Sequence, residues 1–188
     1  LKGVIKNVDG MPLIIQRWTS VAHRSLKLAL CIRTDASPFG MGAILFQNGV
    51  PQAWLSEEWS SVDAQALRAQ VGDAAWQAEW ELLALVVAVD TWLPRLHSQA
   101  CVLQTDALAA LYDVVKLAGK TPLMNALAAE LTLRLECAQV QVVASHLSGT
   151  LNFECDALSR VAQGAQIPQT VRSITRSSSR PRSASFFW

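Results

Sequence analysis

Acidic residues are the side chains of this sequence whose types and spacing are best suited to chemistry. Residues 30–36 and 101–107 are built alike, because each is a largely apolar run that ends in Thr-Asp-Ala. Each run predicts a strand, and in α/β sheets the carboxyl ends of neighbouring strands lie at one edge. We therefore expect Asp35 and Asp106 to lie close together. Taken alone, each aspartate also fits a cap for the turn or helix that follows it.

Glu81 favours a shared acidic site over two independent caps. It lies in a helix predicted for residues 76–93, where Pro94 is expected to end the helix. Three apolar residues follow Glu81 at helical spacing: Leu85, Ala88 and Trp92. Glu81 therefore begins a stripe that faces the core, where a carboxylate is costly to bury unless a positive charge neutralises it. Glu79 begins a stripe that ends at the polar Asp90, and we expect Glu79 to be solvated.

A fourth acid, Asp156, lies in the first turn of the last predicted helix. Residues 146–160 run from a histidine at the end of a strand, through a glycine-containing loop, to this aspartate. An acid in the first turn is also favoured by the helix dipole, so a purely structural role remains open. Glu154 is the competing ligand in this stretch.

The elements that must position these residues follow from hydrophobic periodicity. Strands are predicted at residues 28–34, 42–46, 50–55, 99–105 and 140–145. Helices are predicted at residues 76–93, 108–117, 123–136 and 153–161. Asn48-Gly49 is a hairpin signal between the second and third strands, and residues 57–75 are ambiguous. Three strands in a meander followed by alternating helix and strand predict an α/β domain with a mixed sheet flanked by helices.

Length and composition limit the alternatives. With 188 residues, the chain has room for one domain and loose ends, and its net charge of +1 gives no strong attraction to nucleic acid. Charged residues interrupt the longest apolar stretch, so we expect a soluble protein. The four cysteines form no zinc-type pair, and we expect buried free thiols, as in an intracellular protein.

The two ends differ in composition from the middle. Residues 1–25 mix Gly, Pro and basic residues and predict a lead-in or linker, and residues 26–163 hold the domain. Residues 164–188 are rich in Ser and Arg and predict a disordered tail. Its arginines are expected either to be solvated or to touch phosphates. The chain begins at Leu1 without a methionine, which fits a piece of a longer polyprotein.

Residues 34–43 resemble the first-strand signature of the ribonuclease H domains of LTR-type (Ty3/gypsy-like) retrotransposon reverse transcriptases. Three further motifs are similar to those of the same family. Residues 79–86, together with Trp92, resemble its catalytic helix, and residues 105–107 resemble the segment that holds its third acid. The stretch that begins at His146, includes Asn152 and ends with residues 156–160 resembles its closing motif. The resemblance spans roughly residues 28–161. Four motifs in the family's order make a chance match improbable.

The resemblance implies a five-stranded ribonuclease H fold, with three antiparallel strands followed by two parallel ones. It also implies hydrolysis of the RNA strand of RNA/DNA hybrids with two Mg²⁺ ions, which Mn²⁺ can replace. The catalytic acids and metal ligands would be Asp35, Glu81, Asp106 and Asp156. By position, Asp35 would bridge both ions, with Glu81 and Asp106 chiefly on one and Asp156 on the other.

Four further residues receive roles from the resemblance. His146 would carry a proton or help the product leave, although a histidine satisfied at a strand end is the alternative. Asn152 would contact the substrate near the scissile phosphate, unless its amide only holds the loop. Ser37 and the Gly40 backbone would read 2′-hydroxyls, unless the glycines here only form a tight turn.

An upstream polymerase domain is the expected partner besides the hybrid. Between residues 108 and 136 only Lys116, Lys120 and Arg134 are basic, so the isolated domain should hold phosphates poorly. The rival interpretation is an inactive ribonuclease H-like connection module that binds nucleic acid without cutting it. An integrase or resolvase core is a second rival, but it lacks the combination of Glu81 with the closing motif.

Overall fold

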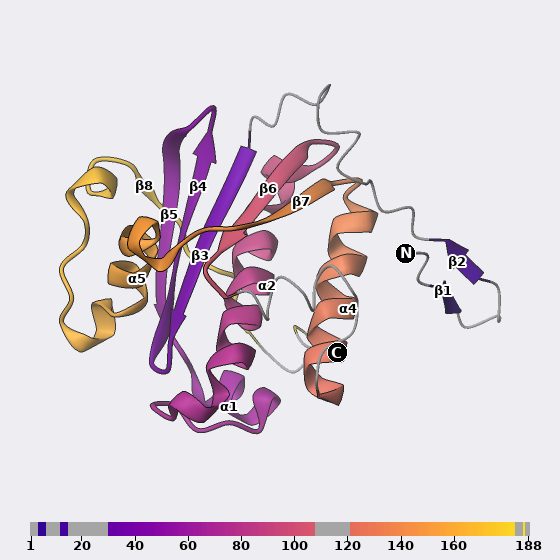
Figure 1. The fold of residues 1–188 in the computed structure, drawn as a ribbon, viewed down its shortest axis with the longest axis horizontal. Coiled ribbons are helices and arrows are strands. Elements are labelled where there is room, and N and C mark those ends of the chain that lie inside the picture. Colours follow the sequence, from indigo (N-terminus) through magenta and orange to yellow (C-terminus); the bar gives the residue numbers. More distant parts are fainter. Residues whose placement is uncertain (1–3, 7–11, 15–29, 108–120, 183–185, 187–188) are drawn as a thin grey trace.

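The structure is a computed structural model that describes residues 4–6, 12–14, 30–107, 121–182 and 186. A mixed sheet of six strands, in the order β7-β6-β3-β4-β5-β8, forms its centre (Figure 1). The short strands β1 (Val4–Lys6) and β2 (Pro12–Ile14) pair separately and antiparallel, within the predicted lead-in. The candidate site depends on the six-stranded sheet.

The first three strands of this sheet form the predicted antiparallel meander. They are β3 (Leu30–Ser37), β4 (Gly40–Gln47) and β5 (Val50–Glu58). Asn48 and Gly49 both have positive φ, at 53° and 78°, as a tight two-residue hairpin turn requires. The Asn-Gly signal therefore identified the turn correctly.

Two strands are added in parallel on one side of β3, and helices make the crossovers. β6 (Ala100–Thr105) pairs with β3, and β7 (Gln141–His146) pairs with β6. The helices α2 (Gln77–Leu96) and α4 (Pro122–Cys137) precede these two strands. These boundaries agree with the predicted elements to within a few residues. The predicted helix at 108–117 lies outside the described residues.

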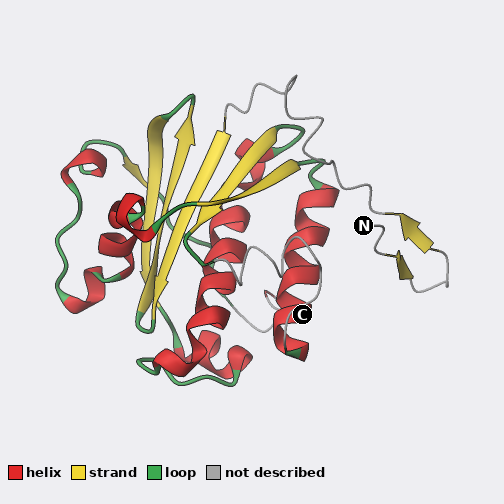
Figure 2. Cartoon of the chain, in the orientation of Figure 1, coloured by secondary structure: helices red, strands yellow, loops and turns green. Residues whose placement is uncertain are grey.

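Alternation along β4 shows how the sheet divides two cores. Met41, Ala43 and Leu45 belong to the larger core under α2 and α4, whereas Ile44 and Phe46 belong to a smaller core. The helix α5 (Phe153–Ser159) covers this second face, so helices lie on both sides of the sheet (Figure 2). Asp35 and Ser37 face α5, because successive side chains on a strand alternate and both contact Ser159.

The long helix α2 is buried along most of its length, and Pro94 does not end it. The helix continues through Pro94 to Leu96, which differs from the predicted stop. The ambiguous segment before it contains α1 (Ser61–Leu67), whose start is a capping box formed by Ser60 and Asp63. Among the described residues, no helix combines the length and apolar character that a membrane crossing requires.

The predicted disordered tail differs from the structure over residues 164–182. Val171 is fully buried in the smaller core, and β8 (Thr175–Arg176) pairs in parallel with β5, which makes six strands where five were predicted. The composition was misleading because two arginines of this segment, Arg180 and Arg182, are bound by acids of the domain. The cysteine prediction also needs a correction: all four thiols are free, but Cys137 is exposed.

Candidate functional site

Three of the predicted acids lie together at the edge of the sheet where β6 ends. One carboxylate oxygen each from Asp35, Glu81 and Asp106 can be chosen so that all three lie within 4.8 Å of one another. The parallel register that pairs Leu30 with Cys101 and Arg33 with Gln104 continues to Asp35 beside Asp106. The repeated Thr-Asp-Ala endings therefore place these two acids side by side, as predicted.

Asp35 is held from the side of α5. The Ser159 hydroxyl donates a hydrogen bond of 2.8 Å to Asp35 Oδ2. Gly42 lies opposite Asp35 on β4, and a Cβ at that position would lie 2.3 Å from the Cys155 carbonyl oxygen. Gly42 therefore allows α5 to pack directly on the sheet, which brings Ser159 within reach of Asp35.

Glu81 enters the site from α2. Its side chain is only 5% exposed, in agreement with its predicted place at the head of the apolar stripe. Gln77, one helical turn earlier, donates from one amide nitrogen to the Ala36 carbonyl oxygen at 2.6 Å and to Glu81 Oε1 at 3.0 Å. Thr105 adds a long hydrogen bond of 3.5 Å to Glu81 Oε2.

Glu79 was expected to be solvated, and this expectation is wrong, since it is only 8% exposed. The inference depended on the polar residue Asp90 at the end of its stripe. Asp90 is itself buried, because Arg134 and Arg180 pair with it there. A polar residue at the end of a helical stripe therefore did not show that the stripe is exposed to solvent.

The site is electrostatically strained in the metal-free protein. The pKa of Asp35 is raised to about 7, chiefly by burial and also by the charges of Asp106 and Asp156, while the Ser159 hydrogen bond and the charge of Arg160 oppose the rise. Burial also raises the pKa of Glu81 well above its ordinary value, with the charges of Asp35 and Asp106 acting in the same direction. No salt bridge reaches Asp35, Glu81 or Asp106 from any residue that the structure describes.

Asp156 lies on α5 but is not one of the three clustered acids. Its side chain is 47% exposed, and its carboxylate pairs with Arg160 at 2.7 Å, one helical turn later. Its charge nevertheless raises the pKa of Asp35, which indicates that it lies near the cluster. The alternative role in the first turn of the helix also fits this position.

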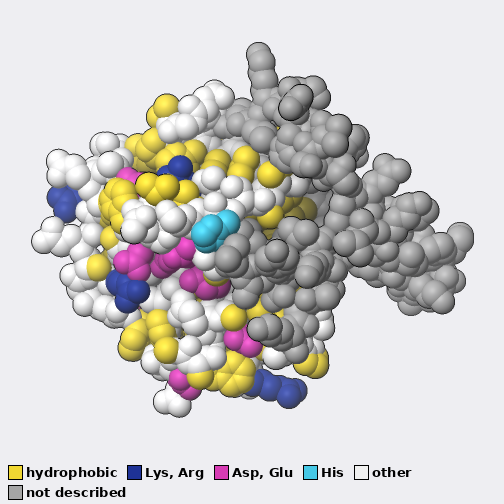
Figure 3. Space-filling view, viewed as in Figure 1, with side chains coloured by type: hydrophobic (Ala, Val, Ile, Leu, Met, Phe, Trp, Pro, Cys, Tyr) yellow, Lys and Arg dark blue, Asp and Glu magenta, His cyan; other side chains and the backbone are white. Residues whose placement is uncertain are grey.

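The closing loop after β7 lies against Asp106. His146 is exposed and stands in register with Thr105, the residue before Asp106. A Cβ on Gly149 would lie 3.1 Å from Asp106 Oδ2, so the loop passes close to that carboxylate. Figure 3 shows acidic side chains gathered beside a histidine on this face of the molecule.

Asn152 is buried, and its amide holds the loop. Its Nδ2 donates to the Thr34 carbonyl oxygen at 2.9 Å, next to Asp35, which matches the loop-holding alternative. Its Oδ1 is buried without a hydrogen-bond partner among the described residues. Asn152 therefore fixes α5 and the loop to β3, on the side that carries Asp35.

Ser37 and Gly40 serve packing in this structure. The Ser37 hydroxyl is fully buried and donates to the Ser159 carbonyl oxygen at 2.8 Å. A Cβ on Gly40 would lie 2.5 Å from the Glu57 carbonyl oxygen, so glycine is needed there for close contact with β5. The predicted contact of Ser37 and the Gly40 backbone with 2′-hydroxyls stays a prediction.

The residues of the cluster fit a hard divalent cation. Carboxylate oxygens are the ligands that Mg²⁺ and Mn²⁺ prefer. A cation would offset the cost of placing the buried Asp35 and Glu81 beside the half-buried Asp106 without a salt-bridge partner among the described residues. The raised pKa values of Asp35 and Glu81 have the same origin. The site therefore suits metal binding on the chemistry of its ligands.

Two residues that were not predicted to belong to the site position its acids. Gln77 lies four residues before Glu81 on one helix, and Ser159 lies three residues after Asp156 on another. Residues at these spacings share a helix face, so this signal was available in the sequence. The contact of Ser159 with Asp35, in contrast, depends on how α5 docks on β3.

Solved structures show the same fold. The chain resembles RNase H1 from the halophilic archaeon Halobacterium salinarum NRC-1 with a TM-score of 0.57 and 13% identity, covering 72% of this chain and 98% of that one. An RNase H1 isolated from compost, solved in complex with an RNA/DNA hybrid, has a TM-score of 0.55 and 14% identity over 69% of this chain and 92% of that one. The N-terminal RNase H domain of a Mycobacterium tuberculosis protein has a TM-score of 0.53 and 12% identity over 69% and 94%.

Sequence comparison identifies the family. No curated protein sequence matched the chain. The family model described as the RNase H-like domain found in reverse transcriptase matches residues 25–132, which is more than half of the chain and includes Asp35, Glu81 and Asp106. Together with the sheet order and the acidic cluster, this match places the chain in the family of RNase H-like domains found in reverse transcriptase.

Proposed function

We propose that this domain hydrolyses the RNA strand of RNA/DNA hybrids with two divalent metal ions, normally Mg²⁺. The cluster of Asp35, Glu81 and Asp106 carries this proposal, because it is acidic, has two buried members and lacks a salt-bridge partner among the described residues. Family membership supports a place within a reverse transcriptase. The four motifs further favour an LTR-type (Ty3/gypsy-like) retrotransposon as its source.

The acids act as ligands in this proposal. Bound divalent ions would stabilise the negative charge that develops on the attacking and leaving oxygens of an in-line displacement. Asp35 would serve both ions, as the resemblance implies, and the Ser159 hydrogen bond would fix its orientation. Asp156 is the proposed fourth ligand. Its carboxylate has to leave the ion pair with Arg160 to bind a metal ion.

His146 is the proposed proton carrier. Its imidazole is exposed beside the loop that passes Asp106, so it can reach a product oxygen while staying in contact with solvent. Asn152 supports the site from behind through its bond to the Thr34 carbonyl oxygen, rather than by touching the substrate.

The hybrid is the proposed substrate because the fold is that of RNase H1 proteins, one of which was solved with an RNA/DNA hybrid. RNA is distinguished from DNA by its 2′-hydroxyls, which the shallow minor groove displays. With a net charge of +1, the chain neutralises few phosphates by itself. We therefore propose that an upstream polymerase domain supplies much of the grip on the hybrid.

One observation favours a second candidate, an inactive RNase H-like module that binds nucleic acid. Asp156 is paired with Arg160 and lies outside the group of three carboxylates. Three acids suffice for one ion, whereas the two-ion mechanism needs the fourth ligand. The two candidates differ in whether a bound hybrid is cut.

The test uses the full chain, Mg²⁺ and a hybrid with labelled RNA. Cleavage of the RNA in the hybrid, with single-stranded RNA largely intact, is the expected result, and Asp35→Asn should abolish it. Glu58→Gln is the matched control, since Glu58 is an exposed acid on β5 and should not matter for cleavage. A wild-type chain that binds the hybrid but leaves it uncut would replace the proposal with the inactive module.

A further inference from the structure

Residues 174–182, which we call the C-terminal strap, cross the sheet edge and two helices. The indole nitrogen of Trp54 on β5 donates to the Ile174 carbonyl oxygen at 3.2 Å, and the Ser177 amide donates to the Trp54 carbonyl oxygen at 2.7 Å. Trp92 on α2 donates to the Ser177 hydroxyl at 3.0 Å. The strap is therefore joined to the domain through its backbone as well as its side chains.

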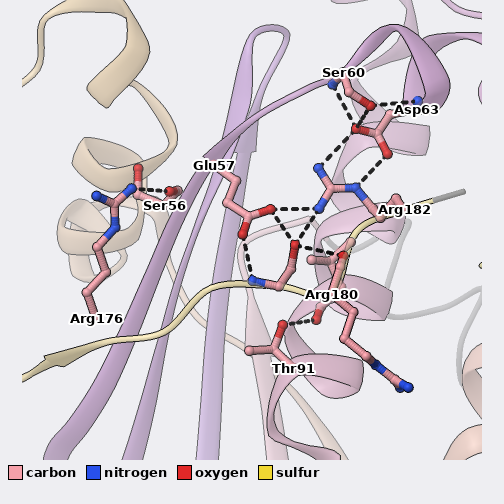
Figure 4. Close-up of polar contacts among 10 residues, drawn as sticks. Ser56, Glu57, Ser60, Asp63, Thr91, Arg176, Arg180 and Arg182 are labelled. Atoms are coloured by element: carbon pink, nitrogen blue, oxygen red, sulfur yellow. Dashed lines mark hydrogen bonds and ion pairs between the residues drawn. The ribbon is translucent and has the colours of Figure 1, made fainter.

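Arginines of the strap bind acids on three different elements. Arg182 is only 7% exposed at its side chain, and it pairs with Asp63 on α1 and with Glu57 on β5, both at 2.6 Å. Arg180 pairs with Asp90 on α2. Figure 4 shows Arg182 reaching from the strap toward Glu57 and Asp63. Because Asp63 and Asp90 are buried, these arginines supply charge that the acids need.

Ser179 lies at the centre of this ion-pair network. Its amide and its hydroxyl both donate to the Glu57 carboxylate, at 2.7 and 2.6 Å. Its hydroxyl oxygen also accepts a hydrogen bond of 2.7 Å from Arg182 Nη1, the nitrogen that binds Glu57. A single oxygen atom thus contacts both an acid of the domain and the main arginine of the strap.

The two neighbouring serines differ from Ser179 in their contacts. Ser177 accepts from the Trp92 indole and meets no carboxylate in the described contacts, and Ser178 is exposed. Only Ser179 of the three donates to an acid. Arg176 lies three residues before it, and Arg180 follows it directly, a setting that suits kinases selecting arginine near the target serine.

We propose that Ser179 is a phosphorylation site and that its modification releases the C-terminal strap from the domain. The donor is ATP with an arginine-directed protein kinase. A bond forms between the Ser179 oxygen and the γ-phosphorus, the bond from that phosphorus to the leaving oxygen of ADP breaks, and the hydroxyl proton passes to a base of the kinase. The modification adds about −1.5 to −2 charges at neutral pH.

The phosphate is incompatible with the docked strap for two reasons. It removes the hydroxyl proton that Glu57 accepts and brings a second anion against that carboxylate. It also competes for Arg182, whose loss leaves Asp63 fully buried without its cation. Release of the strap therefore relieves the repulsion and lets solvent reach Asp63.

The main test places phosphoserine in the full chain at position 179, and at position 178 as the matched control. Trypsin cleavage after Arg176 reports release, because that bond lies where β8 pairs with β5. Phosphoserine at 179 is expected to speed this cleavage by roughly tenfold or more, whereas phosphoserine at 178 leaves it nearly unchanged. Equal cleavage of the two phosphorylated chains would overturn the proposal.

Ser179→Ala separates added charge from lost hydrogen bonding. The variant loses the hydroxyl bond to Glu57 but adds no anion, so its cleavage after Arg176 should rise only a few-fold. Cleavage as fast as that of the chain phosphorylated at 179 would show that repulsion is not the cause and would refute the mechanism.

The kinase step is tested on the unmodified full chain with ATP and the catalytic subunit of cyclic-AMP-dependent protein kinase. A free peptide of residues 174–183 serves as the accessible reference. Mass spectrometry should place phosphate on Ser179 in both. Modification of the peptide alone would contradict access to Ser179 in the folded protein, and modification of neither would contradict recognition by an arginine-directed kinase.

Discussion

Two groups of three acids occupy different parts of this domain. Asp35, Glu81 and Asp106 form the candidate metal site, and Glu57, Asp63 and Asp90 lie under the C-terminal strap. The strap and α4 supply arginines to the second group. The first group receives no salt bridge within the described part of the chain.

The pKa values of Asp35 and Glu57, one acid from each group, are shifted in opposite directions. Burial and the neighbouring acids together raise the pKa of Asp35 to about 7. Burial would also raise the pKa of Glu57, but hydrogen bonds from Arg182 and Ser179 outweigh it and lower the pKa. A buried carboxylate is costly unless a positive charge lies beside it. The group of acids without a basic partner is therefore the one expected to bind a cation.

Loss of a carboxylate from the candidate metal site should affect cleavage most strongly. Asp35→Asn should lower hybrid cleavage by on the order of 10³-fold, because a ligand of the metal site is lost. The same change removes a strained charge, so the metal-free variant should melt no lower than the wild type. Cleavage assays and calorimetry on one preparation measure both quantities. Retained cleavage would show that Asp35 is not a metal ligand.

Removing an arginine from the strap should lower the stability of the folded protein. Arg182→Ala leaves Asp63 fully buried without its partner and should cost about 3–5 kcal/mol in the free energy of unfolding. The double variant Arg182→Ala with Asp63→Asn should recover part of that loss, as urea unfolding can measure. A single variant as stable as the wild type would mean that the pair does not contribute to folding.

The raised pKa of Asp35 makes the stability of the protein depend on pH and on metal. Between the ordinary value of 3.8 and about 7, folded Asp35 holds a proton that the unfolded chain has lost. The metal-free protein should therefore lose stability as pH rises through this window. Mg²⁺ should add about 3 kcal/mol at roughly 100 times its Kd, with a larger effect at pH 8 than at pH 5.

Thermal melting at both pH values, with and without Mg²⁺, measures this dependence. Asp35→Asn is the control, since it removes one titrating acid and should make the profile of the metal-free protein less steep, while Glu81 still contributes. A wild-type melting temperature that rises from pH 5 to pH 7 without metal would refute the assignment of strain to Asp35.

The hydroxyl of Ser159 on α5 should have a smaller effect on the metal site. Ser159→Ala removes the hydroxyl that orients Asp35 and should raise the Mg²⁺ concentration for half-maximal cleavage by roughly tenfold, as expected for a bond to a charged group. Ser56→Ala is the matched control, because its buried hydroxyl donates to the Leu158 carbonyl oxygen and not to an acid. Equal shifts in both variants would indicate loosening of α5 rather than orientation of Asp35.

The meander, the crossovers and three clustered acids could be predicted because local patterns determine them. The Asn48-Gly49 turn and the two Thr-Asp-Ala endings are short motifs with direct structural consequences. The helical stripe also placed Glu81 correctly, because burial of one helix face is a periodic property.

The tail could not be predicted from its composition. Serines and arginines suggest a solvated chain, since few apolar side chains are available to bury. Arg182 becomes buried only because Glu57 and Asp63, more than a hundred residues away, face it. Glu79 was missed for a related reason, because arginines at Asp90 bury a stripe that looks polar in sequence.

Gly42 has a consequence for sequence tolerance. It carries no reactive atom, yet any side chain at this position would push against Cys155, Leu158 and Ser159 together. In a saturation-mutagenesis screen for cleavage, even alanine at position 42 should score almost as poorly as loss of a carboxylate. The short distance between β4 and α5 thus restricts the residues allowed at position 42, although this position has no catalytic group.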